Sequence, residues 1–354
     1  MASKPNPKDS MKSTWRTADR STWTWKHKIL NFADVHPSTV DQPIPVHAKT
    51  DKIPHLTQVS QHAFILVQAF APILVQQAWM SLSGFGSMHR VATFVLYFQA
   101  FNLGVVHEVH MLRRLAHRYG FLDGDVHERD GVPDVGVGKV IASLLKTTGA
   151  RIAMAIYLTY LPDQAPLDVL SSPWWWAWLP FATGLYGVVL DFWFYVYHRA
   201  MHDVGPLWKF HRTHHLTKHP NPLLTAYGDH EQEFFDMVGV PFLTYLTFRA
   251  MGMPLGFFDW WICHQYIVYN EVWGHSGIRV HNTAATTWAW LLTALGAEIA
   301  VEDHDLHHRK GYRKSHNYGK QTRLWDRIFG TCHERIESRE AQIDYVNTAS
   351  MPLF

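Results

Sequence analysis

Histidines are concentrated in three short clusters in the second half of the 354-residue chain. The clusters read HRAMH at 198–202, HRTHH at 211–215 and HDLHH at 304–308. In a helix, residues three or four positions apart project from one face, so the histidines of a cluster can reach the same metal ion or neighbouring ions. The histidines at these spacings are His198, His202, His211, His214, His215, His304, His307 and His308. Eight imidazoles exceed the roughly four ligands that one zinc ion takes, which indicates a two-metal site.

The repeated spacing is more informative than any single histidine, which on a helix is more often solvated or hydrogen-bonded than a ligand. Imidazole binds iron, zinc, copper and nickel, so the ligand type alone does not name the metal. A hydrolytic zinc site usually combines about three protein ligands with an open position for water. An excess of imidazoles beside apolar segments instead favours a pair of redox-active irons, because the inert C–H bonds of lipids require activated dioxygen.

Long apolar segments accompany the clusters. Four of them have lengths near the roughly 20 residues that cross a hydrocarbon core: 62–80, 91–106, 140–161 and 174–197. Shorter apolar runs at 237–250 and 257–269 form either a membrane hairpin or buried helices. Trp174, Trp175 and Trp176 favour the membrane reading over a large soluble helical core, since indole rings prefer the interface. The sequence therefore predicts an all-α integral membrane protein with four to six transmembrane helices.

The distribution of charge predicts the orientation. The loop after the second apolar segment holds Arg113, Arg114 and Arg118, whereas the loop at 162–173 holds two aspartates and no lysine or arginine. Positively charged loops remain in the cytosol. If residues 237–269 form a membrane hairpin, the chain returns to the same side before the third cluster. All three clusters then lie on the cytosolic side, in a helical cap that holds the histidine-rich dimetal site.

Composition argues against several other classes of protein. A net charge of +2 and a pI near 8.4 do not point to nucleic acid. Cys263 and Cys332 are too few for a disulfide framework or a cysteine-type zinc cluster. HEVH at 107–110 has one spacer too few for the zinc-protease motif HExxH. The chain shows neither a glycine-rich dinucleotide motif after a strand nor a haem-binding HPGG, so electrons must come from another protein.

The chain divides into four parts on these patterns. Residues 1–55 are polar and are expected to form a largely flexible cytosolic segment, and 56–170 contain the N-terminal hairpin, the basic loop and the third span. Residues 171–335 form the catalytic region with the clusters, and 336–354 form a C-terminal tail.

The clusters, together with WDRIFGT at 325–331, resemble the fatty acid hydroxylase / sterol desaturase superfamily, whose members are membrane di-iron oxygenases. The resemblance covers about 180–331. It implies two iron ions, with zinc possible in an isolated protein, and O2 as co-substrate. It also implies a cytochrome b5-type electron donor with its reductase, and an endoplasmic reticulum membrane with the clusters facing the cytosol.

The resemblance adds two ligand candidates, and the spacing adds two carboxylates. His230, in AYGDHEQE, and His275, in WGHSG, resemble further ligands of the superfamily; their alternatives are a helix-capping role and a buried hydrogen-bonded histidine. Asp303 and Asp305 flank the third cluster and are candidates to accept the second N–H of a ligating imidazole, the alternative being solvated surface charge. No catalytic residue beyond the metal ligands is expected.

The sequence thus predicts an oxidoreductase that hydroxylates or desaturates an unactivated carbon of a lipid-like substrate. That substrate could be a sterol, a sphingoid base, a fatty acyl chain or a lipophilic secondary metabolite. The alternative is a membrane metal transporter or sensor that binds zinc through the clusters. A transporter needs several polar or ionisable residues within its spans, and few are found. A zinc-dependent hydrolase is a weaker alternative.

Overall fold

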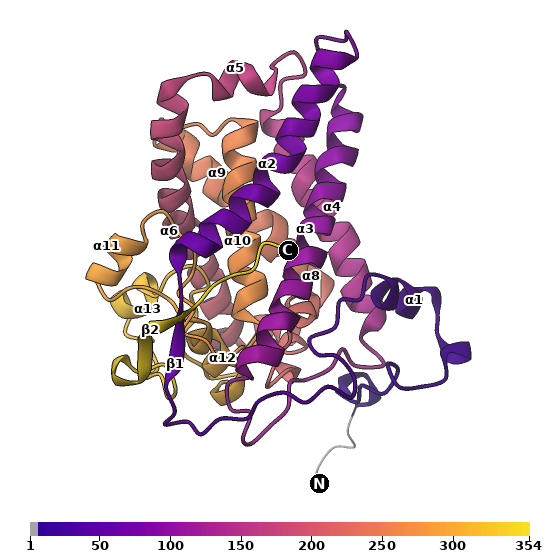
Figure 1. Cartoon of the computed structure of the whole chain (residues 1–354), viewed down its shortest axis with the longest axis vertical. Coiled ribbons are helices and arrows are strands. Elements are labelled where there is room, and N and C mark those ends of the chain that lie inside the picture. Colours follow the sequence, from indigo (N-terminus) through magenta and orange to yellow (C-terminus); the bar gives the residue numbers. More distant parts are fainter. Residues whose placement is uncertain (1–5) are drawn as a thin grey trace.

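In the computed structural model, which describes residues 6–354, an upright bundle of helices stands on a broader base (Figure 1). The helices of the bundle are α2 (Gln58–Leu82), α3 (Arg90–Tyr119), α4 (Val137–Thr159), α6 (Pro173–Asp203), α9 (Val240–Ala250) and α10 (Phe257–Gly274). The short α5 (Pro166–Leu170) lies at the end of the bundle farthest from the base (Figure 1). Successive helices of the bundle run in alternating directions, so α6 and α10 both end at the base.

Helix α10 is the central helix of the bundle and contacts α2, α3, α4 and α6. Its sequence is rich in apolar and aromatic residues and most of its side chains are buried, as expected for a helix surrounded by other helices. The indole nitrogens of its tryptophans have buried acceptors: Trp260 Nε1 donates to the Tyr186 hydroxyl at 2.9 Å, and Trp261 Nε1 donates to the Ala69 carbonyl at 2.8 Å. The run at 257–269 is therefore buried among neighbouring helices, whereas α9 packs mainly on α6 and leaves Phe242 and Leu246 exposed.

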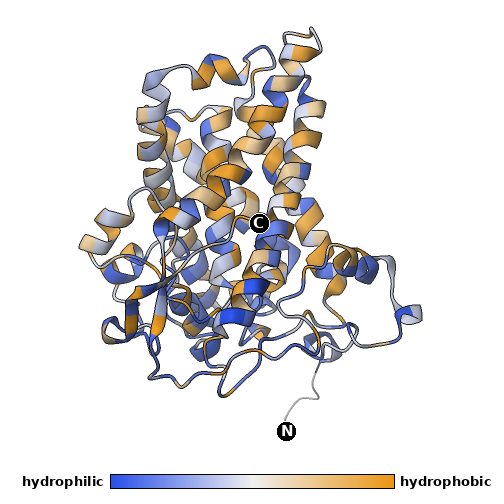
Figure 2. Ribbon diagram, in the orientation of Figure 1, coloured by the Kyte–Doolittle hydropathy of each residue, from blue (hydrophilic) through white to orange (hydrophobic). Residues whose placement is uncertain are grey.

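The bundle has the surface of a membrane protein. The upper part of the bundle is mainly hydrophobic and the base mainly hydrophilic (Figure 2). Large apolar side chains are exposed on the outside of the bundle: Val67, Leu74, Trp79, Val95, Leu103, Tyr157, Trp174, Phe242 and Leu246. Exposed apolar area on this scale marks a contact surface, and on helices of this length it fits lipid.

Within residues 6–354, three helices are long and apolar enough to cross a membrane, namely α2, α4 and α6. The expected span at 91–106 is part of α3, which is 30 residues long and continues through HEVH and the arginines to Tyr119. Helices α9 and α10 are 11 and 18 residues long. The number of four to six spans stays a prediction.

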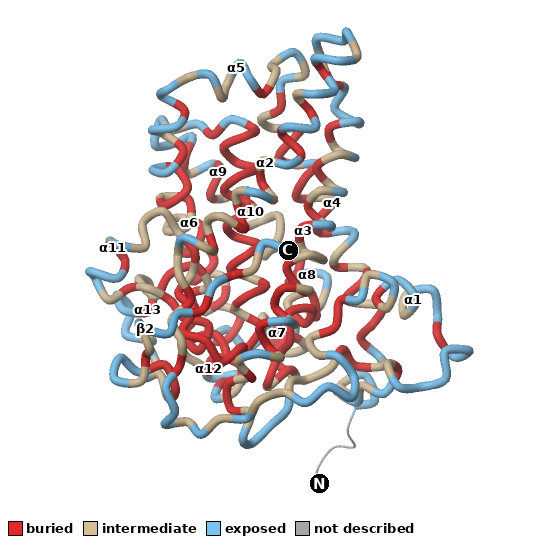
Figure 3. Tube along the Cα trace, in the orientation of Figure 1, coloured by how far each residue is buried: buried red, intermediate tan, exposed pale blue. Residues whose placement is uncertain are grey.

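The base consists of short elements joined by loops. Its helices are α1 (Trp25–Phe32), α7 (Gly205–His211), α8 (His230–Phe234), α11 (Ala289–Ala294), α12 (Val301–Lys310) and α13 (Leu324–Ile328). Its shorter helical turns are η1 (Pro7–Asp9), η2 (Arg20–Thr22), η3 (His214–Leu216), η4 (Pro222–Ala226), the π-helical η5 (Phe235–Gly239) and η6 (Glu340–Gln342). Buried residues are concentrated around α12 and the lower ends of the bundle helices (Figure 3).

The fold is mostly helical but contains a small parallel sheet that the all-α prediction did not include. Strand β1 (Ile53–Leu56) pairs with β2 (Ile343–Ala349), and Ile53 lies opposite Ile343. Parallel strands need a long connection, so two short strands almost 300 residues apart leave no local hairpin pattern in the sequence.

The N-terminal segment also differs from the flexible lead that was expected, because residues 6–55 make specific contacts with the base. Trp15 is buried, and its backbone N–H donates to Asp134 at 2.9 Å. Arg212, which lies inside the second histidine cluster, donates to both oxygens of Asp9 at 3.0 and 2.5 Å. These partners lie more than 100 residues away in the sequence, so polar composition alone did not reveal them.

Candidate metal centre

The histidine clusters meet where the bundle joins the base. His198 and His202 lie on the last turns of α6, one helical turn apart. His211 ends α7, and His214 and His215 lie on η3 directly after it. The third cluster lies on α12, and His275 follows the last residue of α10. The structure therefore brings together all eight histidines of the clusters and one of the two further candidates.

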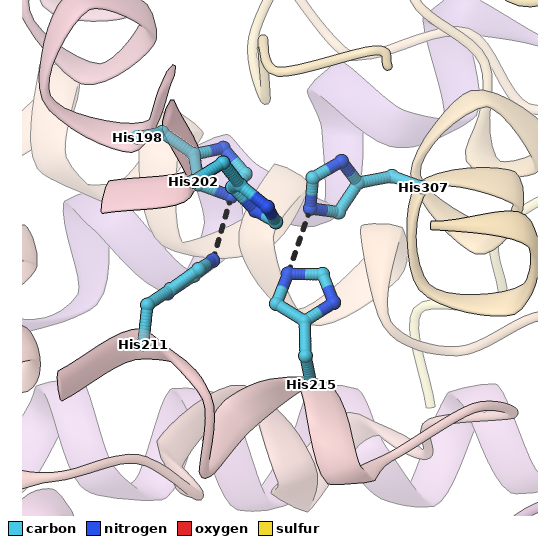
Figure 4. A group of neighbouring side chains, drawn as sticks. All are labelled: His198, His202, His211, His215 and His307. Carbon is cyan, nitrogen blue, oxygen red and sulfur yellow. Dashed lines mark hydrogen bonds between the residues drawn. The ribbon is translucent and has the colours of Figure 1, made fainter. Parts of the chain in front are cut away.

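These nine side chains form two groups, and within each group one nitrogen per residue lies within 4.8 Å of the others. The first histidine group contains His198, His202, His211, His215 and His307. The second histidine group contains His214, His275, His304 and His308. In Figure 4 the rings of the first group converge on one space from α6, from the α7–η3 segment and from α12. The shortest Nε2 to Nε2 distances are 3.0 Å for His198–His211 and His215–His307, and 3.1 Å for His275–His304.

The two groups are adjacent. His214 and His215 are consecutive residues and belong to different groups, with ring centroids 5.8 Å apart. The rings of His215 and His308, also from different groups, are 4.8 Å apart. Two metal ions bound in these groups would therefore be neighbours.

Seven of the nine imidazoles are oriented by hydrogen bonds on the side away from the group, the exceptions among the described residues being His215 and His304. In the first group, His198 Nδ1 donates to the Tyr318 carbonyl and His307 Nδ1 to the His316 carbonyl, both at 2.7 Å. In the second group, His275 Nδ1 donates to the Glu271 carbonyl at 2.8 Å. Nδ1 also donates to a backbone carbonyl in three further histidines: His202 to Arg313, His214 to Tyr227 and His308 to Thr217. In His211, Nδ1 donates to the side-chain oxygen Oε1 of Gln232. Because a carbonyl can only accept, Nδ1 carries the hydrogen and the lone pair of Nε2 is directed into the group, as metal binding requires.

Burial keeps these rings neutral. All nine are at most 3% exposed. Burial, together with nearby Lys320, lowers the pKa of His214 to about 3. Burial and neighbouring imidazoles hold the pKa of five further histidines well below the ordinary histidine value. These are His211, His215, His304, His307 and His308. The neutral imidazole is the form that binds a metal ion.

The side chains fit a pair of metal ions. His202 Nε2 and His308 Nε2, one in each group, are buried without a hydrogen-bond partner among the described residues. A buried acceptor normally has a partner, and a metal ion supplies one. The donor set consists of nitrogen atoms only, which suits iron, zinc, copper or nickel rather than magnesium or calcium.

His230 lies outside both groups, since it is exposed on the first turn of α8. Its segment AYGDHEQE contributes Gln232 to the site instead: the buried Gln232 Oε1 accepts from His211 Nδ1 at 3.0 Å. Sequence alone does not identify Gln232, because a glutamine near a histidine carries no ligand signature.

Asp303 and Asp305, expected to accept from ligating imidazoles, bond to other groups. Asp303 accepts from Arg335 at 2.7 Å and from the backbone N–H of Ala300 at 2.8 Å, where it caps α12. Asp305 accepts from Arg129 at 2.6 Å. Both aspartates are fully buried, so they are not solvated surface charge either. They fix the position of α12, and backbone carbonyls orient most of the imidazoles.

The loop after α12 is held by two further aspartates. Asp191 of α6 accepts from the backbone N–H groups of Lys320 and Gln321 at 2.8 and 2.9 Å. Asp326, in the WDRIFGT segment, accepts from the backbone N–H groups of Tyr318 and Gly319, both at 2.8 Å. These bonds place the Tyr318 carbonyl against His198 and explain why the segment accompanies the clusters.

A cavity of about 20 Å³ adjoins the second histidine group. His275 and His304 line it together with Trp273, Glu271 and Lys320. Lys320 Nζ and Glu271 Oε2 form an ion pair at 2.9 Å. The second histidine group therefore has a space beside it that accepts one water-sized group.

Comparison with known proteins agrees with this site. A sequence profile described as fatty acid hydroxylase matches residues 183–331, which include all nine grouped histidines. Fatty acid hydroxylase vlmA of Lecanicillium sp is 46% identical over 308 residues, which are 85% of this chain and 84% of that protein. Alkylglycerol monooxygenase of Xenopus tropicalis is 28% identical over 186 residues, 52% of this chain and 36% of that protein. Delta(7)-sterol-C5(6)-desaturase of Nicotiana tabacum is 27% identical over 171 residues, 48% of this chain and 55% of that protein.

No solved structure matches the chain. The relative that shares 46% identity covers most of both chains, and the profile covers the metal centre. The resemblance on which the histidine clusters were first interpreted is thereby confirmed, and the chain belongs to the fatty acid hydroxylase / sterol desaturase superfamily.

Proposed function

We propose that this protein is a di-iron enzyme that uses O2 and external electrons to oxidise an unactivated carbon of a lipid-like substrate. The observation that carries the proposal is the pair of adjacent, buried, all-imidazole groups at the foot of an apolar helix bundle. As a member of its superfamily, the chain is a membrane oxidoreductase of the hydroxylase or desaturase type. That membership argues against the zinc transporter or sensor considered as the alternative.

Within this function, the iron pair supplies activation of dioxygen, and the chain supplies the setting. The nine imidazoles hold the metals, and backbone carbonyls orient six of the rings. The bundle excludes water and keeps the target carbon close to the second histidine group, a contribution of orientation rather than chemistry.

The proposed substrate class is a fatty acyl or related alkyl chain, and the proposed reaction is hydroxylation. The relative with 46% identity is named a fatty acid hydroxylase, and a second relative is named an alkylglycerol monooxygenase. Sterol desaturation, which the Nicotiana tabacum relative represents, is supported by lower identity.

The proposed location is the endoplasmic reticulum membrane, with several spans and the base in the cytosol. Arg113, Arg114 and Arg118 lie near the end of α3 that enters the base, so the positive charge and the metal centre share one side. Positive charge on that side supports a cytosolic base. A cytochrome b5-type protein and its reductase are the proposed source of electrons, because the sequence lacks an electron-carrying cofactor motif of its own.

Isotope labelling tests this function. Cells that produce the wild-type protein or the His307→Ala variant are grown under heavy-oxygen dioxygen, and their lipid extracts are compared by mass spectrometry. Wild-type cells should contain a lipid that gains one labelled oxygen atom, and the variant should lack it. A product whose new oxygen comes from water, or that forms without dioxygen, would contradict the proposal.

A further inference from the structure

A small polar cavity lies within the helix bundle, between α2, α3 and α10. Its volume is about 20 Å³. Its polar lining comes from Gln68 of α2, Glu108 of α3, and Gln265 and Tyr269 of α10. The remaining walls are apolar or small: Phe64, Ile65, Gly104, Val105 and Val268. None of these residues lines the cavity beside the second histidine group.

Three polar atoms on this cavity lack a hydrogen-bond partner among the described residues. They are Glu108 Oε1, Gln265 Nε2 and the Tyr269 hydroxyl, and all three are buried. Buried polar groups in folded proteins are nearly always paired, so three unpaired atoms on one cavity indicate a missing partner. A group that can both donate and accept, such as a hydroxyl or an amine, can pair with the carboxyl, the amide and the phenol.

Glu108 has no evident role in holding the fold. Its side chain is 3% exposed, and within residues 6–354 it forms no ion pair. The HEVH motif that contains it is unrelated to the metal centre, since Glu108 is in neither histidine group. An acidic side chain buried in a membrane bundle usually marks a path or a site for a ligand.

The size of the cavity limits the group that can bind. A space of about 20 Å³ accepts one water-sized group. A hydroxyl or an amino group fits it and can donate to Glu108, whereas a phosphate or a sugar is too large.

The cavity lies close to the metal centre along α10. Tyr269 and Trp273 are one helical turn apart, with ring centroids 6.3 Å apart, and Trp273 lines the cavity beside His275 and His304. From Tyr269 to His275 the backbone advances by about 9 Å, at about 1.5 Å per residue. A polar group bound at Glu108 would therefore lie within about two helical turns of His275.

We propose that Glu108, Gln265 and Tyr269 bind the hydroxyl or amino end of the lipid-like substrate and thereby select the carbon that is oxidised. This inference rests on the proposed function and deepens it, because within the proposed class it favours alkyl chains that end in a hydroxyl or amino group over chains that end in a carboxylate. Oxidation then occurs a short distance from the polar end and not at the distal methyl group.

Binding to the full-length, iron-loaded protein in detergent tests the proposal. The probes are a radiolabelled long-chain primary alcohol, the corresponding amine, and the alkane of the same length. Wild-type protein should bind the alcohol and the amine about tenfold more tightly than the alkane, the effect of one strong hydrogen bond. Glu108→Gln should remove most of the preference for the amine, and Tyr269→Phe should weaken the preference for the alcohol about threefold.

Tyr160→Phe is the matched control, because it removes a buried hydroxyl that donates to the Met88 carbonyl, outside the cavity. It should leave both preferences unchanged, and iron content confirms folding of every variant. If Glu108→Gln does not fold, Tyr269→Phe decides. Equal binding of alcohol and alkane by the wild type means that the cavity holds only water and overturns the proposal, as does an unchanged preference in the folded variants.

Binding is measured without reductant or turnover. Failure of the proposed function would appear as the absence of an oxygen-dependent product, whereas failure of this inference would appear as the absence of a head-group preference. The two outcomes are therefore distinguishable.

Discussion

The two histidine groups differ in ligand number and in surroundings. The first group has five imidazoles, three of which donate to carbonyls of the loop after α12. The second group has four imidazoles and adjoins a cavity that His275 and His304 line. Metal sites saturated by protein ligands are closed, whereas catalytic sites keep a position open. We therefore expect the substrate carbon to approach the second group, while the first group completes the pair.

Removal of one ligand from each group gives the largest expected effect. His214→Ala leaves the second group with three imidazoles and should lower both bound iron and turnover by at least about a hundredfold. This loss exceeds the one typical of removing only a hydrogen-bond partner of a metal ligand. His202→Ala leaves the first group with four imidazoles and should lose less iron than His214→Ala. Iron analysis and product formation on the purified variants measure both. Equal loss in the two variants would remove the distinction between the groups.

A smaller effect is expected at Gln232, which orients His211 in the first group. Gln232→Leu removes the acceptor of the Nδ1 hydrogen and should weaken iron binding about tenfold. Gln232→Glu keeps an acceptor and should restore binding. His230→Ala, two residues away on the same helix, is the control and should bind iron as the wild type does. A loss in His230→Ala equal to that in Gln232→Leu would return His230 to the ligand set.

The smallest effect concerns pH and the metal-free protein. Because burial lowers the folded pKa of His214 to about 3, the unfolded chain binds more protons than the folded chain between that value and the ordinary histidine pKa of about 6.5. The stability contributed by keeping this ring neutral is present above about pH 6.5 and is lost as the pH falls toward 3. The thermal unfolding temperature of metal-free protein should therefore fall on acidification through this window, and His214→Phe should reduce the slope. An unchanged slope would show that burial of this imidazole has little effect on its titration.

The sequence identifies the histidines that converge in the structure but does not identify the groups that orient them. The eight histidines of the clusters are recognisable because helical spacing places them on one face, and His275 followed from the resemblance. The supports are mostly backbone carbonyls, such as those of Tyr318 and His316, and every residue type has one. Proximity in sequence predicts that Asp303 and Asp305 accept hydrogen bonds from the imidazoles of the third cluster. Instead, Arg335 donates to Asp303 and Arg129 donates to Asp305, and both arginines are distant in sequence.

The same limit applies to the fold. Apolar length predicts α2, α4 and α6 as spans, because crossing a membrane depends on local composition. Apolar length does not distinguish a helix surrounded by other helices, such as α10, from a helix that faces lipid, because both are rich in apolar residues. The sheet between β1 and β2 depends on pairing across almost the whole chain, which local patterns do not encode.

X-ray absorption spectroscopy of the iron-loaded protein tests the central claim most directly. We predict two irons per chain and a first coordination shell dominated by imidazole nitrogen. We also predict a signal from iron–iron scattering that disappears in His214→Ala. A single iron without that scattering signal, or an iron shell dominated by oxygen, would contradict the assignment of the two histidine groups to a metal pair.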